Sequence, residues 1–216
     1  FRETDDIAAQ DGEEVVSTET AIVSRFVEAN GGRDVMLDMR TLALRGELSQ
    51  DKQTFEMYNL KRQPGDFYLR LTRGNVQIGI GLSPTDAWQS VENTANGARQ
   101  VTDLDEESVR TFRGLVNFFH PFAQYAIDGA GTISSLEEEV TEDGQQRFRI
   151  RFSPADRERI YEVTLVGPDL LLTTSEYLTE DGAVSRSEYA DHRKTDGLWI
   201  PFSVTNYTDN ELTSEV

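Results

Sequence analysis

The residues that could perform chemistry are few in this chain, and they do not combine into a catalytic group. The only histidines are His120 and His192, and there is no cysteine. His120 stands before a proline among phenylalanines, and His192 lies among charged residues in a predicted strand. The spacings HExxH and GxSxG, a P-loop and a zinc-site spacing are all absent. The sequence therefore predicts a protein that is not an enzyme and uses no cofactor.

Acidic side chains are abundant, but their spacing does not match that of a metal site. Asp103 and Asp105 lack the glycine and the distal glutamate of an EF-hand calcium loop. The three glutamates at 137–139 are typical of a solvated strand end. Gly79 and Gly81 lie inside a strand pattern rather than at a strand-to-helix turn, which argues against a phosphate site. We therefore expect no metal.

The charge of the chain restricts its partners and its amino-acid usage suggests its compartment. The chain carries 39 acidic and 21 basic residues, for a net charge of −18. A field of this sign repels phosphate backbones, so we expect no nucleic-acid partner. The absence of cysteine fits an oxidising compartment, and no apolar run reaches the length of a membrane span. Because the chain opens at Phe1 rather than Met, we expect that a targeting segment has been removed.

The elements that must position any site are mostly strands. Apolar and polar residues alternate between 42 and 92 and again between 147 and 207, with the period of a β-strand. Asp-Gly turns at 143–144, 181–182 and 196–197 separate alternating segments, and this dipeptide is a strong hairpin signal. Consecutive hairpins form an antiparallel meander. We expect about nine to eleven strands in one curled sheet.

Three segments depart from the strand pattern. Residues 1–18 are acidic with few large apolar groups and are expected to form a flexible tail, so that the folded domain is 19–216. A helix is expected from Glu19 to the Asn30-Gly31-Gly32 stop. A second helical stretch, about 108–127, contains Pro121, which should divide it into two short helices or kink it.

This second helical stretch is rich in aromatic residues. Phe112, Phe118, Phe119 and Phe122 occupy more than one helical stripe, so the stretch must be sandwiched or must cover something. One interpretation is an ordinary plug of the core. The other is a lid over an apolar cavity in the concave face of a curved sheet. The pattern alone leaves both open.

Several short motifs along residues 19–207 carry a resemblance to a known family. They are Gly31-Gly32 followed by Met39-Arg40-Thr41-Leu42 and Gly46; Lys61-Arg62-Gln63-Pro64 leading into Phe67-Tyr68-Leu69-Arg70; the segment from Leu82 to Trp88; Phe119-His120-Pro121-Phe122-Ala123-Gln124-Tyr125; and Asp196-Gly197-Leu198-Trp199-Ile200-Pro201. Together they resemble the LolA-like superfamily of bacterial envelope lipoprotein carriers and their relatives. Gln63 is an insertion relative to the Lys-Arg-Pro motif of that family.

The resemblance implies a fold and a location. The fold would be α+β and mainly antiparallel β, with a single strongly curved, unclosed half-barrel sheet and helices covering its concave face. In the carriers the concave space receives the acyl chains of lipoproteins, and the arginine that matches Arg62 helps to hold the lid closed. A periplasmic or outer-membrane-associated location is implied as well.

The expected cavity takes residues from the sheet and from the lid. The strand pattern does not decide which row of each strand faces inward. The expected ligand-binding residues are Leu44, Phe55, Met57, Leu69, Ile78, Ile80 and Trp88 from the sheet, and Phe112, Val116, Phe119 and Phe122 from the lid.

Two hypotheses about function follow from these observations. The first is a monomeric periplasmic carrier or chaperone that holds a lipid, an acyl chain or an acylated protein. The second is an envelope sensor or regulatory domain of the same fold that binds a protein partner. A hydrolase is disfavoured, because no nucleophile–base pair is visible in the sequence.

Overall fold

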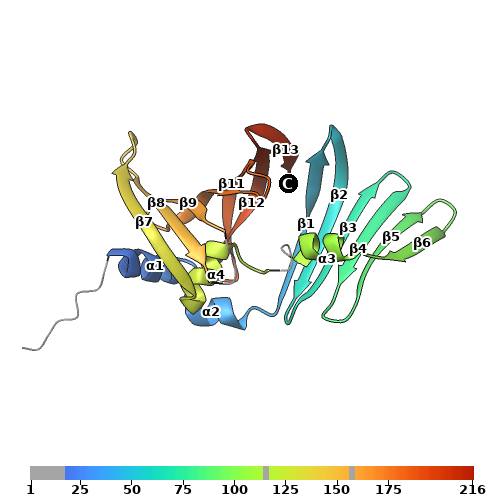
Figure 1. Ribbon diagram of the computed structural model, residues 1–216, viewed down its shortest axis with the longest axis horizontal. Coiled ribbons are helices and arrows are strands. Elements are labelled where there is room, and N and C mark those ends of the chain that lie inside the picture. Colours follow the sequence, from blue (N-terminus) through green and yellow to red (C-terminus); the bar gives the residue numbers. More distant parts are fainter. Residues whose placement is uncertain (1–17, 114–116, 156–158) are drawn as a thin grey trace, which may run out of the picture.

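The sheet dominates the architecture. The structure is a computed structural model that describes residues 18–113, 117–155 and 159–216. Its thirteen strands form one antiparallel sheet in the order β6-β5-β4-β3-β2-β1-β13-β12-β11-β10-β9-β8-β7. The outermost strands, β6 and β7, do not pair with each other, so the curved sheet is unclosed (Figure 1). The predicted half-barrel is confirmed, with two strands more than the upper expectation.

The sheet has two halves that follow the sequence order. The N-terminal half consists of β1 (Thr41–Gln50), β2 (Gln53–Arg62), β3 (Asp66–Arg73), β4 (Val76–Leu82), β5 (Ala87–Asn93) and β6 (Ala98–Asp103). The C-terminal half consists of β7 (Gly131–Val140), β8 (Gln146–Pro154), β9 (Tyr161–Val166), β10 (Leu171–Leu178), β11 (Val184–Thr195), β12 (Leu198–Thr208) and β13 (Glu211–Glu215). They join where β1 meets β13, through the register pairs Ser49–Glu215 and Gln50–Ser214.

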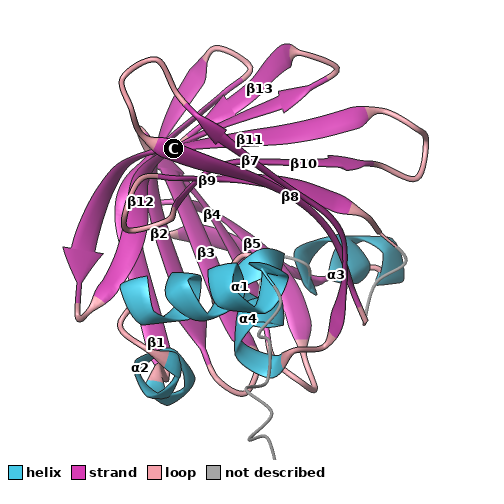
Figure 2. Ribbon diagram, turned by 90° about the vertical axis from the view of Figure 1, so that its left-hand side faces the viewer, coloured by secondary structure: helices cyan, strands magenta, loops and turns pink. Residues whose placement is uncertain are grey.

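The helices of the described residues lie on the concave side of the sheet (Figure 2). They are α1 (Thr18–Ala29), α2 (Arg33–Asp38), α3 (Glu106–Arg113) and α4 (Pro121–Asp128). Figure 1 shows α1, α2 and α4 beside the C-terminal half and α3 beside the N-terminal half. The predicted tail at 1–18 lies outside the described residues, except for Thr18, which begins α1.

Pro121 divides the aromatic segment into two helices, as its chemistry predicts. It occupies the first turn of α4, where its missing N–H leaves no helical hydrogen bond unmade. His120 caps this helix, because its Nδ1 accepts a hydrogen bond from the backbone N–H of Phe122 at 3.1 Å. Gly129 ends the helix in a left-handed conformation, with φ of 70°.

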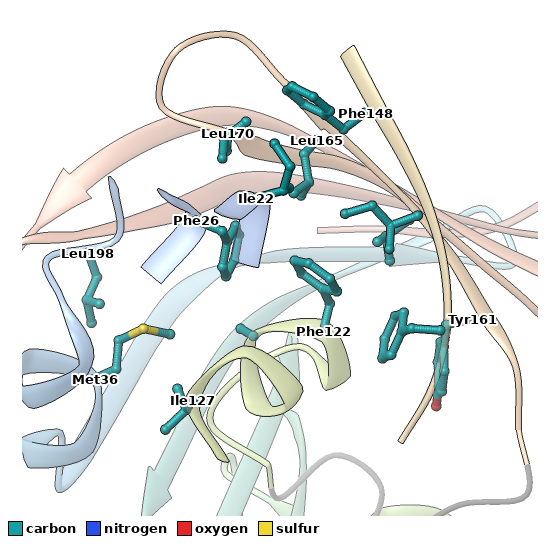
Figure 3. Close-up of a cluster of buried hydrophobic side chains, with 14 residues drawn as sticks. Ile22, Phe26, Met36, Phe122, Ile127, Phe148, Tyr161, Leu165, Leu170 and Leu198 are labelled. Atoms are coloured by element: carbon teal, nitrogen blue, oxygen red, sulfur yellow. The ribbon is translucent and has the colours of Figure 1, made fainter. Parts of the chain in front are cut away.

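The main core lies between the helices and the C-terminal half (Figure 3). Phe148, Ile150 and Phe152 form the inner row of β8, and each is at most 1% exposed. The alternate row of the same strand is arginine, and Arg151 pairs with Glu162 on the outer face at 2.9 Å. Residues far apart in the sequence cover this core on the side of the helices: the ring centroids of Phe26 in α1 and Phe122 in α4 are 5.0 Å apart.

The N-terminal half has a much smaller core. Its buried apolar cluster is Phe67, Ile80 and Leu82, against which Phe112 of α3 packs. None of the side chains described in α3 is itself buried. Farther along the same inner face, Val76 and Val91 are 46% and 50% exposed. The short helix α3 therefore covers only part of this half.

Candidate functional site

A cavity of about 420 Å³ lies where the two halves of the sheet approach each other beneath the helices. Strands β1 and β2 supply one wall, and β10, β11 and β12 supply the other. Residues 117–121, which lead into α4, together with α1 and α2 complete the enclosure. The apolar lining residues are Phe26, Met36, Met39, Leu42, Leu44, Phe118, Phe119, Pro121, Ala123, Leu170, Leu171, Leu172, Leu198, Ile200, Pro201 and Val204.

The strand register explains why residues of β1 and β2 reach this cavity. Leu42 pairs with Lys61, and Leu44 pairs with Asn59, so these four side chains share the concave face. Lys61 in turn pairs with Phe67, a core residue of the same face. The alternation of β1 places Ala43 and Arg45 on the opposite, exposed face.

Polar groups are a minority of the lining. They come from Asn30, Lys61, Asn117, His120, Tyr189, His192 and Trp199. Asn30 donates from Nδ2 to the carbonyl of Phe26 at 2.9 Å, and Nε2 of His192 donates to the carbonyl of Leu172 at 2.9 Å. Burial raises the pKa of Tyr189 to about 12, so its hydroxyl is neutral at physiological pH. The cavity thus has an apolar body with a few fixed polar groups, as ligand sites commonly do.

His120 and Ser175 form a close pair that the sequence did not reveal. Nε2 of His120 lies 2.8 Å from Oγ of Ser175, an arrangement that general-base activation of a serine would use. However, Nδ1 of His120 accepts the backbone N–H of Phe122, so the proton of this neutral imidazole is on Nε2. His120 therefore donates to Ser175, which is itself buried. The direction of this hydrogen bond is opposite to that of a catalytic base.

Lys61 in β2 is one of the sheet side chains that contact residues 117–121, the covering segment before α4. Its Nζ donates to the backbone carbonyl of Asn117 at 2.7 Å. Burial lowers the pKa of Lys61 to about 8, from its ordinary value of 10.5. The hydrogen bond ties β2 to the chain that leads into α4, across 56 residues of sequence.

Arg62 does not have the position that the resemblance implied. It follows Lys61 in β2 and therefore projects from the opposite face of the sheet. There it forms an ion pair with Asp66 at 2.6 Å, and its side chain is 64% exposed. Among the described residues, Lys61 and not Arg62 contacts the segment that leads into α4.

The predicted lid residues separate into two groups. Phe119 lines the cavity together with Phe118, so the segment before α4 covers it as a lid would. Phe122 is fully buried against Phe26 and Phe152, so α4 itself is a plug of the core. Val116 lies outside the described residues. The lid interpretation therefore applies to the residues before α4, and the core-plug interpretation applies to α4 itself.

Among the predicted sheet residues, Leu44 lines the cavity, and most others lie beside it on the same concave face. Phe55 and Met57 are on the inner row of β2, Leu69 is on that of β3, and Ile78 and Ile80 are on that of β4. The register forms continuous apolar rows across the strands, such as Met57–Leu71–Ile78–Val91. These residues are an extension of the concave face outside the enclosed cavity, and Phe112 packs against part of it.

Trp88 lies on the wrong face for the predicted cavity. It pairs with Gly81, whose neighbours Ile80 and Leu82 point inward, so Trp88 points outward. A Cβ atom at Gly81 would lie 2.4 Å from Cε2 of Trp88, so the tryptophan lies directly on the glycine backbone. Its ring is 6.1 Å from that of Tyr68 on the same outer face. The alternate glycines Gly79 and Gly81 were the sequence signal that could have indicated the outward position of Trp88, because they leave room for an indole on that face.

Much of the cavity lining came from residues that the sequence prediction did not select. The C-terminal strands contribute Leu172, Tyr189 and Ile200, the turn before β10 contributes Leu170, and the short helix α2 contributes Met36. These strands alternate just as those of the N-terminal half do. The Leu198–Pro201 stretch, which lines the cavity, was part of a motif used for the resemblance but was not assigned to the site.

Two general features of the described chain bear on the site. None of the helices in the described residues is long and apolar enough to cross a membrane. Within the same residues, no group of three or more histidine, aspartate or glutamate side chains is arranged to hold a metal ion.

Comparison with known proteins supports the fold. No protein-family model matches the sequence, and no curated protein matches it. A crystal structure of a LolA superfamily protein from Nitrosomonas europaea is similar to this chain with a TM-score of 0.53, at 12% sequence identity. The match covers 92% of this chain and 90% of that chain. The half-barrel with helices on its concave face is thus shared over nearly the whole length, and this chain has a LolA-like fold.

Proposed function

We propose that this protein is a non-enzymatic carrier that holds a lipid or an acyl chain in the concave face of its sheet. The observation that carries the proposal is the cavity of about 420 Å³, lined mostly by apolar side chains from strands and helices. Pockets that hold small ligands generally have volumes of roughly 300–1,000 Å³ and predominantly apolar walls. The LolA-like fold supports the proposal. We extend the proposal to a role in the bacterial envelope.

The energetics favour a long apolar ligand. Burial of an acyl chain contributes about 0.8 kcal/mol per methylene, before the cost of ordering the chain. The cavity wall at Leu42 and Leu44 continues on the concave face into the apolar rows of β2, β3 and β4. Because these rows are incompletely covered, an acyl chain longer than the enclosed cavity would find further apolar surface there.

We further propose that the covering segment, residues 117–121, moves when a ligand enters. Residues 117–121 are held to the sheet by the Lys61–Asn117 hydrogen bond and by the His120–Ser175 hydrogen bond. The neutral His120–Ser175 bond contributes about 0.5–1.5 kcal/mol net and the bond from the Lys61 ammonium about 1.5–3 kcal/mol, so local opening costs less than global unfolding. A ligand bound beneath the segment would then stabilise the closed form by mass action.

The test combines lipid analysis with a variant that fills the cavity. Mass spectrometry of organic extracts of the purified protein should reveal acyl-chain lipids. Palmitate should displace the neutral fluorophore N-phenyl-1-naphthylamine from the protein. In Leu44→Trp the added ring occupies the cavity, so affinity for both compounds should fall about tenfold or more.

A matched control lies next to Leu44 in the sequence. Ala43 is exposed on the opposite face of β1, so Ala43→Trp adds the same side chain without reaching the cavity. It should leave binding unchanged. Extracts without lipid, combined with equal binding by the two variants, would contradict the carrier function. Co-purification of a protein partner in that case would favour the envelope sensor.

A further inference from the structure

The cavity contains one cation among its apolar walls. Lys61 is the only lysine or arginine in the described lining. Its Nζ uses one of its three N–H donors, in the hydrogen bond to the carbonyl of Asn117. Among the described residues, no carboxylate lies within ion-pair distance of Lys61. In a chain with a net charge of −18, a partly buried lysine without an acidic partner is unusual.

A second lining residue offers a donor without a partner. The indole of Trp199 can only donate, and its Nε1 is buried with no hydrogen-bond partner in the described structure. A buried donor left unpaired costs free energy, typically about 1–3 kcal/mol. A ligand that supplies an acceptor would recover this cost. Nζ of Lys61 retains two donors and Nε1 of Trp199 retains one, so a ligand acceptor that reached them would gain hydrogen bonds.

Three other polar side chains of the lining are already used within the protein. Nε2 of His192 donates to Leu172, Nε2 of His120 lies against Ser175, and Asn30 donates to Phe26. Lys61 and Trp199 retain donors. Since the former is a cation and the latter a neutral donor, the complementary ligand group is an acceptor with negative charge.

We propose that the cavity selects single-chain amphiphiles with a carboxylate head group, of the fatty-acid type, through Lys61 and Trp199. This inference rests on the proposed function, because the same cavity holds the apolar chain. The apolar chain would lie along Leu42, Leu44 and Phe119, and the carboxylate would accept from Nζ of Lys61.

The charge of the site favours a carboxylate over a phosphate. One lysine neutralises one negative charge, whereas a phosphomonoester carries between one and two at neutral pH. The excess negative charge would be buried without a partner, which is costly. No second cation lines the described cavity to compensate for it.

The experiment compares two ligands with the same chain and different head groups. Binding of palmitate and of 1-hexadecanol to the full chain is measured at pH 7 by displacement of N-phenyl-1-naphthylamine. Palmitate should bind roughly tenfold more tightly, as expected for one charge-assisted hydrogen bond. In Lys61→Met the side chain keeps its length and loses its charge, so this preference should disappear while hexadecanol still binds.

Two further variants separate the contributions. Arg62→Met removes one positive charge from the adjacent residue on the outer face, so it should retain the full preference for palmitate. Trp199→Phe removes the N–H donor and keeps an aromatic ring, so it should reduce palmitate affinity by a smaller factor. If Lys61→Met fails to fold, the comparison of ligands on the unaltered chain still decides.

The outcomes distinguish this inference from the carrier function. Equal binding of palmitate and hexadecanol by the unaltered chain would overturn the head-group preference and leave the carrier function standing. Absence of binding by either ligand would contradict both. A preference for palmitate that persists in Lys61→Met would overturn the role of Lys61.

Discussion

The two halves of the sheet use the same strand pattern but bury it to very different extents. In the C-terminal half, the inner row of β8 is closed off by α1 and α4, and Ile150 is completely buried. In the N-terminal half, only α3 lies on the inner face, and the row that contains Ile78 ends in Val91, which is half exposed. The C-terminal half therefore has a conventional protein core. The N-terminal half presents apolar surface that the described residues leave partly uncovered, beside the cavity proposed to bind the ligand.

Matched isoleucine substitutions should show the largest difference between the halves. Ile150→Ala should lower the free energy of unfolding by about 3 kcal/mol or more, because it leaves a cavity in a close-packed core. Ile78→Ala should cost only about 1 kcal/mol, because its side chain is partly exposed. Urea titration followed by circular dichroism measures both. Equal losses would show that the inner face of the N-terminal half is as well packed as the main core.

The outer face of the N-terminal half should be more sensitive than its inner face. A methyl group at Gly81 would overlap the indole of Trp88, so Gly81→Ala should cost about 1–3 kcal/mol. Combining it with Trp88→Leu should cost less than the sum of the two single changes, because the overlap is removed. Urea titration of the unaltered protein, the two single variants and the double variant gives the double-mutant cycle. Additive losses would contradict the contact, and palmitate affinity should be unchanged in Trp88→Leu.

A smaller effect concerns the pH dependence of stability at the boundary between the halves. Lys61 releases its proton near pH 8 in the folded protein, but near pH 10.5 when unfolded. Between these values the unfolded state binds more protons, so the contribution of Lys61 to stability rises with pH. Since Lys61 is only partly buried, the gain should be about 1 kcal/mol or less.

The measurement is the difference in unfolding free energy between the unaltered protein and Lys61→Met, from pH 7.5 to 9.5. This range avoids the opposite effect of Tyr189, whose folded pKa of about 12 lies above its ordinary value of 10.0. Arg62→Met, with its charge on the outer face, should follow the unaltered protein. A difference that stays constant across the range would mean that the surroundings of Lys61 do not disfavour its charge.

Local patterns in the sequence were sufficient for the fold and for part of the site. Alternation and the Asp-Gly turns predicted the antiparallel sheet, and Pro121 predicted two short helices. Leu44 and Phe119, two of the expected ligand-binding residues, line the cavity. Alternation alone could not assign Trp88 to a face, because this depends on its pairing with Gly81 across a hairpin.

The C-terminal wall of the cavity could not be predicted for a different reason. Which concave surface the helices fill depends on contacts such as Phe26 with Phe122, which are far apart in the sequence. The contact of Lys61 could not be predicted either, because its partner is a backbone carbonyl of a distant segment, and any residue type there would supply that carbonyl. The motif directed attention to Arg62, whereas the pleat of β2 turns Lys61 inward.

The unclosed sheet has a consequence for how copies of this protein behave toward one another. The edge strands β6 and β7 each present a line of backbone groups with no neighbour in the sheet, and such edges promote joining of chains into fibrils and aggregates. Both edges are protected by charge: β7 carries glutamates at 137–139, and β6 has Arg99 and Asp103 among its exposed side chains. Glu137 and Glu139 pair with Arg149 and Arg147 of β8, so the cost of desolvating these charged groups opposes edge-to-edge stacking. Charge at both edges thereby disfavours polymerisation of a sheet that remains unclosed.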